Sequence, residues 1–343
     1  MLEVNWNRES FPEDSLSALN NFNSSLGLEE FEAQISKWML EVNKLPEQLN
    51  MYNTFGEPPV TLFNNGKFAV DIYFWRKNDT IIHSHAFRGA FKVLYGQSLH
   101  EEFQVKITDE IEKDIVCSEI VNSKTTIMNA SDNQIIKPGM ELVHRVLHLD
   151  NPTITLCLRT VEDTELSQWH HLTSGLSFTK YNLDPLTIKR VLYFQYLYNS
   201  NPVNANEFLN NTLKQMDASA KLSLYESLFT NEFGLDYEVS NIIIESMHAH
   251  CENTKWFKLH DAHYSSLQNH LIEYKAPTAE LKLLAHSINS NYTPQKVEQL
   301  LSSVSKTSLK DLLNQLLKEE AIFDEQYFEQ QMKQINKFSQ IIN

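Results

Sequence analysis

Hydrophobic and polar residues change their rhythm along this chain, and the change predicts strands in one part and helices in the others. Between residues 59 and 160, short β-branched and aromatic runs alternate with turn-forming glycine, proline and asparagine at intervals of roughly ten residues. This pattern predicts short strands with almost no helix among them, as in a sandwich or a barrel. The predicted strands cover residues 59–63, 68–75, 80–85, 90–96, 99–107, 114–121, 124–129, 133–139, 142–149 and 153–160.

Apolar residues with helical spacing precede the strands. Residues 12–15 have the composition of a helix cap, and a helix is predicted over residues 28–45. The apolar face of this helix consists of Phe31, Ile35, Trp38, Met39 and Val42. We expect this helical lead-in to pack on the strands.

From about residue 180 the pattern becomes helical, after a loop-like stretch at residues 169–171. Asp184-Pro185 and Thr293-Pro294 each predict a helix start, because the first residue can cap the helix and proline suits its first turn. We expect about eight or nine helices here. Two apolar stripes with helical spacing consist of Leu281, Leu284, Ala285 and Ile288, and of Leu309, Leu312, Leu313, Leu316 and Leu317.

These patterns predict a multidomain α+β protein. The expected parts are a helical lead-in over residues 1–58, a β-barrel over 59–178 and an all-α domain over 179–343. No fixed repeat period appears in the helical part, so a solenoid is not predicted.

Composition narrows the classes of partner. The net charge is −15, and no clustered basic face appears, which argues against nucleic acid. No apolar run approaches the roughly 18 residues of a membrane span, and the acidic N-terminus lacks a signal pattern. Three scattered cysteines fit a reducing compartment better than a disulfide framework, so we expect a cytoplasmic protein.

Candidate chemistry centres on histidine. His83 and His85 lie one residue apart on a predicted strand, so their side chains project from the same face. His144 follows the Pro138-Gly139 turn on another predicted strand, and strands of a closed barrel can face each other across the interior. Neutral imidazole is a common ligand of divalent iron, copper, nickel and zinc. The pattern therefore predicts that His83, His85 and His144 hold a metal ion.

His148 shares the strand face of His144 but lies roughly 13 Å further along, at ~3.3 Å per residue. We expect it to line the cavity or support a ligand, not to bind the same ion. We assign catalytic roles in the cavity to His148, Arg159 and Trp75, and substrate contacts to Arg159, Tyr73 and Cys157. For Arg159, a salt bridge is an equally good alternative to substrate binding. For the aromatic residues the alternative role is core packing, and for Cys157 it is that of a buried, unreactive thiol.

A second set of metal-type side chains lies in the helical part. Pairs three residues apart share a helix face, which raises the alternative of a second metal site. Its candidates are His248, His250, Cys251, His260, His263 and His270.

The histidine segments resemble the two motifs of the cupin superfamily. His83, His85 and Gly96 match the first motif, although Gly89 stands where that motif usually has a glutamate. Pro138-Gly139 and His144 match the second motif, in which His148 replaces the usual asparagine. The resemblance implies a cupin barrel, also called a double-stranded β-helix, with a three-histidine metal site.

Within the cupins, residues 60–160 are most similar to the thiol dioxygenases, cysteine dioxygenase in particular. Residues 65–68, Trp75, the histidine pair and residues 94–96 follow the order of that family, and His144-Arg145-Val146 resembles its third-ligand segment. Those enzymes hold ferrous iron on three histidines and add dioxygen to a thiolate sulfur.

The chain also departs from that family. Residues 87–90 lack the cysteine that crosslinks to a tyrosine, and residues 59–63 lack the arginine that binds the substrate carboxylate. Cys157 and Arg159 stand roughly where the family has its histidine and tyrosine partners. Metal binding therefore carries over, and free cysteine as the substrate does not.

We therefore expect a mononuclear non-heme Fe(II) oxygenase acting with dioxygen on a small molecule, with a thiol as one option. Zinc, nickel or manganese in the same site would instead favour an isomerase or hydrolase. A non-catalytic cupin that senses a ligand and contacts a partner protein is the other alternative. Cupins often dimerise, so the resemblance leaves a homodimer open.

Overall fold

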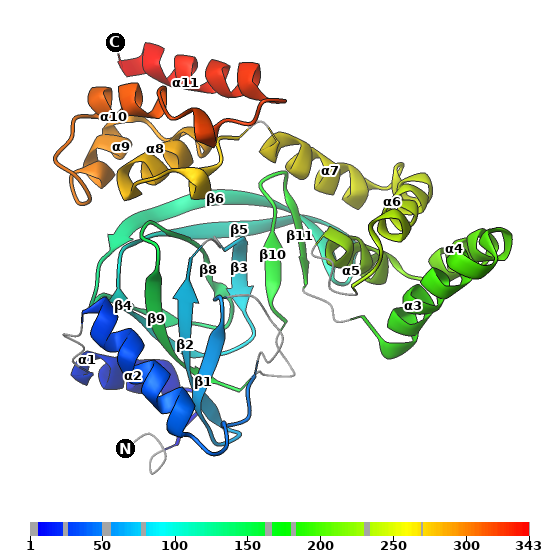
Figure 1. The fold of residues 1–343 in the computed structure, drawn as a ribbon, viewed down its shortest axis with the longest axis horizontal. Coiled ribbons are helices and arrows are strands. Elements are labelled where there is room, and N and C mark those ends of the chain that lie inside the picture. The colour runs from blue at the N-terminus through cyan, green and yellow to red at the C-terminus, as the bar shows by residue number, and fades with distance from the viewer. Residues whose placement is uncertain are drawn as a thin grey trace. The chain divides into compact units, whose positions relative to one another are not determined.

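The protein is of mixed α+β class. The structure is a computed structural model, which describes residues 6–22, 27–49, 56–76, 80–161, 167–179, 183–229, 234–268 and 270–342 (Figure 1). Among these residues, no helix is both long enough and apolar enough to span a membrane.

The strands form two sheets that have the order of a double-stranded β-helix. One sheet has the order β1-β2-β9-β4-β7, and the other strands, in the order β10-β11-β6-β5-β8-β3, are a closed barrel. The interleaved orders 2-9-4-7 and 3-8-5-6 are those of a jelly roll, so the predicted cupin barrel is confirmed. The strands are β1 (Pro59–Asn64), β2 (Phe68–Trp75), β3 (Ile82–His85), β4 (Gly89–Tyr95), β5 (Ser98–Glu112), β6 (Ile115–Met128), β7 (Asn133–Ile136), β8 (Gly139–His148), β9 (Thr153–Thr160), β10 (Trp169–His171) and β11 (Leu176–Thr179).

Two details of the predicted strands were wrong. Residues 114–121 and 124–129 belong to one continuous strand, β6. Between them, Ser123 Oγ donates to the carbonyl oxygen of Glu102 (3.1 Å). Residues 169–171, predicted as loop, are β10, which pairs with β11. Strands this short carry no periodic signal, and their pairing comes from a neighbour that the local sequence does not specify.

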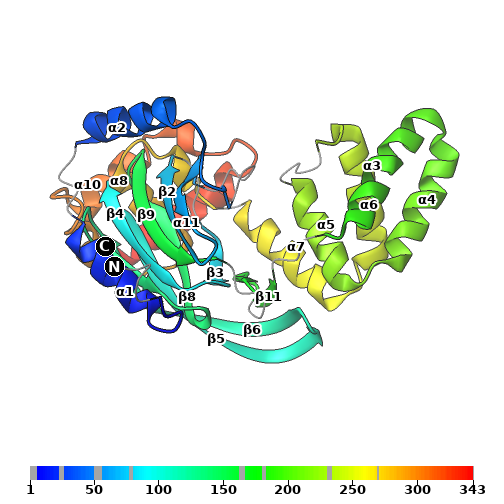
Figure 2. The ribbon, with the colours of Figure 1, turned by 90° about the horizontal axis from the view of Figure 1, so that it is seen from below.

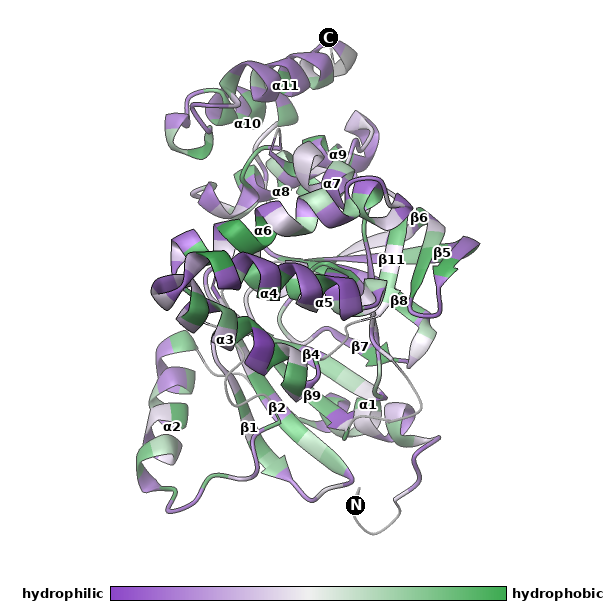
Figure 3. Ribbon diagram, turned by 90° about the vertical axis from the view of Figure 1, so that its right-hand side faces the viewer, coloured by the Kyte–Doolittle hydropathy of each residue, from purple (hydrophilic) through white to green (hydrophobic). Residues whose placement is uncertain are grey.

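Strand β9 shows why a run of apolar and small polar residues reliably predicts a strand that is buried on both faces. Ile154, Leu156 and Leu158 point to the face that packs against the N-terminal helices, while Thr155 and Cys157 point into the barrel. All of its residues are buried, because it lies between β2 and β4. Figure 3 shows the resulting run of hydrophobic residues along β2 and β9, in contrast to the mostly hydrophilic α11.

The N-terminal helices cover the outer face of this sheet (Figure 2). They are α1 (Phe11–Asn21) and α2 (Leu28–Glu41). Helix α1 begins where only a cap was predicted, and α2 ends four residues before the predicted limit. Phe31 is buried as predicted, but Met39 is 44% exposed, so the predicted apolar face is only partly confirmed. Lys92 Nζ on β4 donates to the carbonyl oxygens of Leu19 and Phe22, which anchors the C-terminal end of α1.

Residues from 185 onward are helical, as predicted. Asp184 accepts hydrogen bonds from the backbone of Leu186 and Thr187, and Thr293 accepts one from Lys296, so both predicted helix starts are confirmed. The helices are α3 (Pro185–Ser200), α4 (Pro202–Gln215), α5 (Ala218–Phe229), α6 (Tyr237–Cys251), α7 (Lys255–Leu267), α8 (Ala279–Asn289), α9 (Pro294–Leu301), α10 (Leu309–Leu316) and α11 (Phe328–Ile342), with short 3-10 helices at Glu273–Lys275 and Glu320–Ile322.

The chain divides into two compact units. The barrel unit comprises residues 1–104, 121–167 and 266–343, and the helical unit comprises residues 105–120 and 168–265. Helices α8–α11 therefore group with the barrel, whereas α3–α7 group with the tip of the β5–β6 hairpin. The division into parts at residues 58 and 178 remains a prediction.

Helices α8–α11 share a hydrophobic core with the barrel strands (Figure 1). Leu99 and Leu147 are fully buried against side chains of these helices, and both predicted leucine stripes contribute to that core. Lys282 Nζ of α8 also donates to the carbonyl oxygen of His148 at 2.6 Å. The helices thus cover β5 and β8 on the face opposite the barrel interior.

Candidate metal centre

Three histidine side chains meet inside the barrel unit. Strands β3 and β8 pair in antiparallel fashion, with His83 opposite His144 and His85 opposite Gly139. The three histidines are buried, and each offers a ring nitrogen within 4.8 Å of the others. Among the described residues, this is the one group of three or more metal-type ligands. The structure therefore brings together the three side chains that the sequence predicted as ligands.

The spacing of two of these nitrogens suits a shared ion. The Nε2 atoms of His85 and His144 lie 2.8 Å apart. Two imidazole nitrogens bound to one divalent ion at 2.0–2.1 Å and at right angles would lie about 2.9 Å apart. The two rings thus already have the separation that adjacent ligands of one ion require.

Burial keeps the three imidazoles neutral. It lowers the pKa of His83 to about 4, although a hydrogen bond to the backbone of Ile81 opposes the shift. Burial, followed by neighbouring positive charge, lowers the pKa of His85 and of His144 well below the usual value. Neutral imidazoles have a lone pair available, so no proton has to leave before a metal binds near pH 7.

Two of the rings are held by partners on their other nitrogen. His83 Nδ1 donates to the carbonyl oxygen of Ile81 at 2.7 Å, which leaves the Nε2 lone pair available for a metal. His144 Nδ1 lies 2.8 Å from Nε2 of His100. With His144 Nε2 as a ligand, its Nδ1–H must donate to His100. Such partners fix the tautomer and orientation of metal-binding histidines.

His100 is the functional residue that the sequence reasoning missed. It is buried on β5, where it pairs with Val146 and lies diagonal to His144 on the neighbouring strand β8. Burial lowers its pKa to about 4, which keeps it neutral and able to accept from His144. A histidine within a charged segment gave no signal by itself; the pairing of β5 with β8 would have been needed to find it.

The histidines lie in a pocket of the barrel unit that contains about 560 Å³ of empty space, open solvent at its mouth included. The lining residues are Tyr73, Trp75, Thr80, His83, His85, Phe87, Phe91, Ser98, Ile136, His144, Val146, His148, Thr155 and Cys157.

Stacked rings form one part of this lining. Trp75 lies 4.4 Å from the ring of His148 and 5.5 Å from that of Tyr73, with each pair nearly parallel. Trp75 Nε1 donates to Thr155 Oγ1 at 2.8 Å, and Ser98 Oγ lies 3.0 Å from His148 Nδ1. His148 is outside the cluster of three nitrogens, as its distance along the strand predicts. Burial lowers its pKa to about 3, so it lines the pocket as a neutral ring.

Arg159 and Cys157 occupy different surroundings. Arg159 is not among the lining residues; its Nε donates to Asp71 Oδ2 at 2.7 Å, and its guanidinium lies over the ring of Phe87. This geometry matches the salt-bridge alternative, although the pair is buried instead of lying at a rim. Cys157 lines the pocket, and burial raises the pKa of its thiol to about 12, so it is a neutral thiol at physiological pH.

The second set of histidines does not assemble into a metal cluster within the described residues. Its members have separate partners. His248 Nε2 lies 2.7 Å from Tyr225 Oη, His250 bonds Asn210, and His260 bonds Glu226. These contacts account for their positions in the helical unit without an ion.

Comparisons with known proteins find solved structures that are similar to part of the chain. No family model matches the chain, and no curated protein matches it. An uncharacterised Klebsiella pneumoniae protein with a double-stranded β-helix domain is 14% identical over 36% of this chain and 83% of its own, with a TM-score of 0.24. A cupin-2 domain protein of Shewanella frigidimarina is 10% identical over 41% and 96%, with a TM-score of 0.23. Hydroquinone 1,2-dioxygenase of Sphingomonas, solved with 4-hydroxybenzoate bound, is 10% identical over 31% and 67%, with a TM-score of 0.24.

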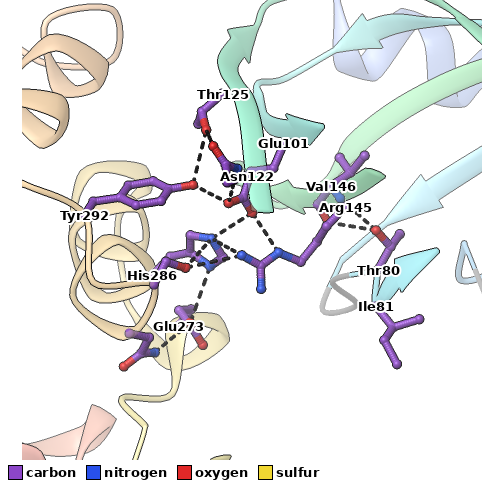
Figure 4. A network of polar contacts seen from close by, with 12 residues as sticks. Thr80, Ile81, Glu101, Asn122, Thr125, Arg145, Val146, Glu273, His286 and Tyr292 are labelled. Carbon is purple, nitrogen blue, oxygen red and sulfur yellow. Dashed lines mark hydrogen bonds and ion pairs between the residues drawn. The ribbon is translucent and has the colours of Figure 1, made fainter. Parts of the chain in front are cut away.

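Behind the pocket, a buried polar network joins strands β5 and β8 to helix α8 (Figure 4). Glu101 accepts hydrogen bonds from Arg145 Nε at 2.7 Å, from His286 Nε2 at 3.1 Å and from the hydroxyl of Tyr292. Burial opposes the charged form of Glu101, but His286 and Arg145 outweigh it and hold its pKa well below the usual value. Nδ1 of His286 lies 3.5 Å from Glu273. The network is therefore charged and almost fully paired.

The network adjoins the metal centre through the backbone. Glu101 follows His100, and Arg145 follows His144. Consecutive strand residues point to opposite faces, so the two histidines face the barrel interior while their neighbours face α8. The C-terminal helices thus hold the two strands from the outside at the level of the candidate ligands.

Proposed function

We propose that this protein is a mononuclear non-heme metal oxygenase that acts on a small molecule, with Fe(II) held by His83, His85 and His144. The observation that carries the proposal is the set of three neutral, buried imidazoles at an apolar pocket. Two of them have the separation of ligands of one ion, and two have a partner that fixes their orientation.

The donor set fits such an ion. Three nitrogen ligands without a carboxylate leave the +2 charge uncompensated, so the centre attracts an anionic group of the substrate. A bound Fe(II) ion would supply the redox chemistry with dioxygen that this set of side chains lacks.

The residues of the chain would then position the substrate. His83 and His144 are fixed by Ile81 and His100, so the ligands need little rearrangement on binding. Trp75 is fixed by its bond to Thr155 and by stacking, which gives the substrate a rigid wall and keeps water out.

A ligand-sensing cupin is the second candidate. Among the described side chains on helices of the helical unit, four large apolar ones are more than half exposed: Leu186, Tyr196, Val203 and Tyr237. In this candidate function, a partner protein would cover these side chains, and binding to that partner would replace catalysis as the output of the site.

The test is anaerobic purification, followed by metal analysis and oxygen uptake with a panel of thiols and phenols. We expect about one iron per chain and substrate-dependent oxygen consumption. His144→Ala should lose the metal, whereas His250→Ala, in the helical unit, should retain it. Iron without turnover on any probe would favour the sensor, and zinc, nickel or manganese without oxygen use would favour an isomerase or hydrolase.

A further inference from the structure

Among the described residues, the lining of the pocket offers no side chain that could neutralise a charge on the body of a ligand. None of the described residues that line it is a lysine, arginine, aspartate or glutamate. Besides its histidines, the lining consists of aromatic and aliphatic side chains, Cys157, and hydroxyl groups of serine and threonine. Desolvating a carboxylate without a partner costs several kcal/mol, so a second negative charge would be rejected strongly.

The guanidinium of Arg159, which lies over the lining residue Phe87, already has a partner. Arg159 and Asp71 are both nearly inaccessible to solvent and form a direct ion pair. Asp71 also accepts a hydrogen bond from the hydroxyl of Thr61, at 2.7 Å. If Arg159 turned toward a ligand carboxylate, Asp71 would be left as a buried charge without its cation. Removing one partner of such a pair typically costs about 3–5 kcal/mol.

The polar groups of the lining are also mostly engaged. Thr80 Oγ1 accepts from the backbone N–H of Val146, Thr155 Oγ1 accepts from Trp75, and Ser98 bonds His148 Nδ1. Two ring nitrogens of the described lining, Nδ1 of His85 and Nε2 of His148, are buried and have no hydrogen-bond partner, and of the two residues only His148 is not a candidate metal ligand. An unpaired buried nitrogen costs about 1–3 kcal/mol, and a neutral polar group on a ligand could recover that.

From these observations we infer the ligand class, an inference that rests on the proposed metal centre. The site takes a small molecule with one anionic head that binds the metal, such as a thiolate or phenolate, and an uncharged apolar body. One neutral polar group on that body meets Nε2 of His148. Amino acids and other ligands with an additional carboxylate are excluded.

Matched probes test this class on the full chain loaded anaerobically with Co(II), whose absorption changes when a thiolate binds. We expect benzenethiol to bind at least ~10-fold more tightly than 4-mercaptobenzoate, which adds only a carboxylate, and L-cysteine to bind more weakly than benzenethiol. Equal or tighter binding of 4-mercaptobenzoate or L-cysteine would overturn the inference.

The role of His148 is tested with the three hydroxybenzenethiol isomers. We expect one isomer to bind several-fold more tightly than benzenethiol, and this ratio to fall to about one in His148→Phe, which keeps a ring against Trp75. Circular dichroism and Co(II) content of the variant show whether the fold and metal site are intact. If no isomer is preferred, or if the preference survives in the variant, Nε2 of His148 does not select the ligand.

Failure of the proposed function has a different signature. Selective binding of benzenethiol to the Co(II) protein, without oxygen uptake by the Fe(II) protein, would overturn the oxygenase and leave the ligand class standing. A chain that binds neither metal would overturn both.

Discussion

At the scale of single residues, the proposed metal centre includes a contact from a histidine that is not a candidate ligand. His100 lies against Nδ1 of His144 and fixes the orientation of that ring. We expect His100→Leu to lower metal affinity by ~10–100-fold, because the ligand loses its outer partner. His100→Gln, whose amide oxygen can still accept a hydrogen bond, should recover part of the loss. Competition with a chelator measures both variants, and an unchanged affinity in His100→Leu would contradict the assignment.

The buried pair of Arg159 and Asp71 gives a prediction about stability. Asp71→Asn leaves the guanidinium buried without its counter-ion, and we expect it to lower the free energy of unfolding by about 3–5 kcal/mol. The double variant Asp71→Leu/Arg159→Met should be less destabilised than Asp71→Asn, because it removes both charges together. Urea denaturation measures the difference, and a neutral Asp71→Asn would show that the pair is not needed for stability.

The positions of site residues were predictable where one strand decides them. The His83–His85 spacing placed two rings on one face, and the Pro-Gly turn pointed to His144. His100 needed the pairing of β5 with β8, and the buried state of Arg159 needed the position of Asp71 on the neighbouring strand. Both depend on which strands meet, and local patterns do not contain that information.

At the scale of elements, helix α8 contributes stability that depends on pH. Burial opposes the charged form of His286, but the carboxylates of Glu101 and Glu273 raise its pKa to about 9. A raised pKa stabilises the fold fully below the ordinary value of 6.5, and this contribution is lost as the pH rises through 9. For Glu101 the pKa is depressed, so its contribution is present above 4.5 and is lost as the pH falls through the folded value.

We therefore expect the free energy of unfolding to decline between pH 6.5 and 9, by up to roughly 3 kcal/mol. His286→Gln should be less stable at pH 6 and should show a flatter profile over this interval. Urea denaturation at several pH values checks this, with His250→Gln in the helical unit as the matched control. A wild-type profile as flat as that of His286→Gln would contradict the charged network.

The helices themselves were predictable from capping and periodicity, and their partners were not. Leu309, Leu312, Leu313 and Leu316 of the predicted stripe form the buried face of α10, although Leu317 is 37% exposed. Asp184 and Thr293 correctly marked two helix starts. An apolar stripe predicts that this face of the helix is buried against another part of the protein. Whether the cover is another helix or the outside of a barrel depends on the tertiary fold.

At the scale of the whole molecule, the barrel unit is assembled from three separated segments of the chain. We expect truncation after residue 269 to abolish metal binding, because Leu99 and Leu147 lose their cover and Lys282 and His286 are removed from strands β5 and β8. Soluble yield and iron content measure the effect. A soluble truncated chain that still holds one iron would show that the barrel is independent of these helices.

The sequence predicted the class and the barrel because strand rhythm and the histidine motifs agree on them. It gave no indication that the last helices group with the barrel while the preceding ones group with a hairpin tip. Both helical segments have similar composition, and the difference lies in contacts across more than one hundred residues of chain, roughly the size of a domain.

The order in which a ribosome makes this chain has a consequence for the leucines under α8–α11. Leu99, Leu147 and Leu149 emerge early, while the side chains that bury them extend to Phe338. At ~5–20 residues per second, the interval is on the order of ten seconds or longer. During that time the hydrophobic surface formed by these leucines is uncovered on the nascent barrel. We therefore expect the yield in a cell to depend on chaperones that shield unfinished chains, as well as on the stability of the folded protein.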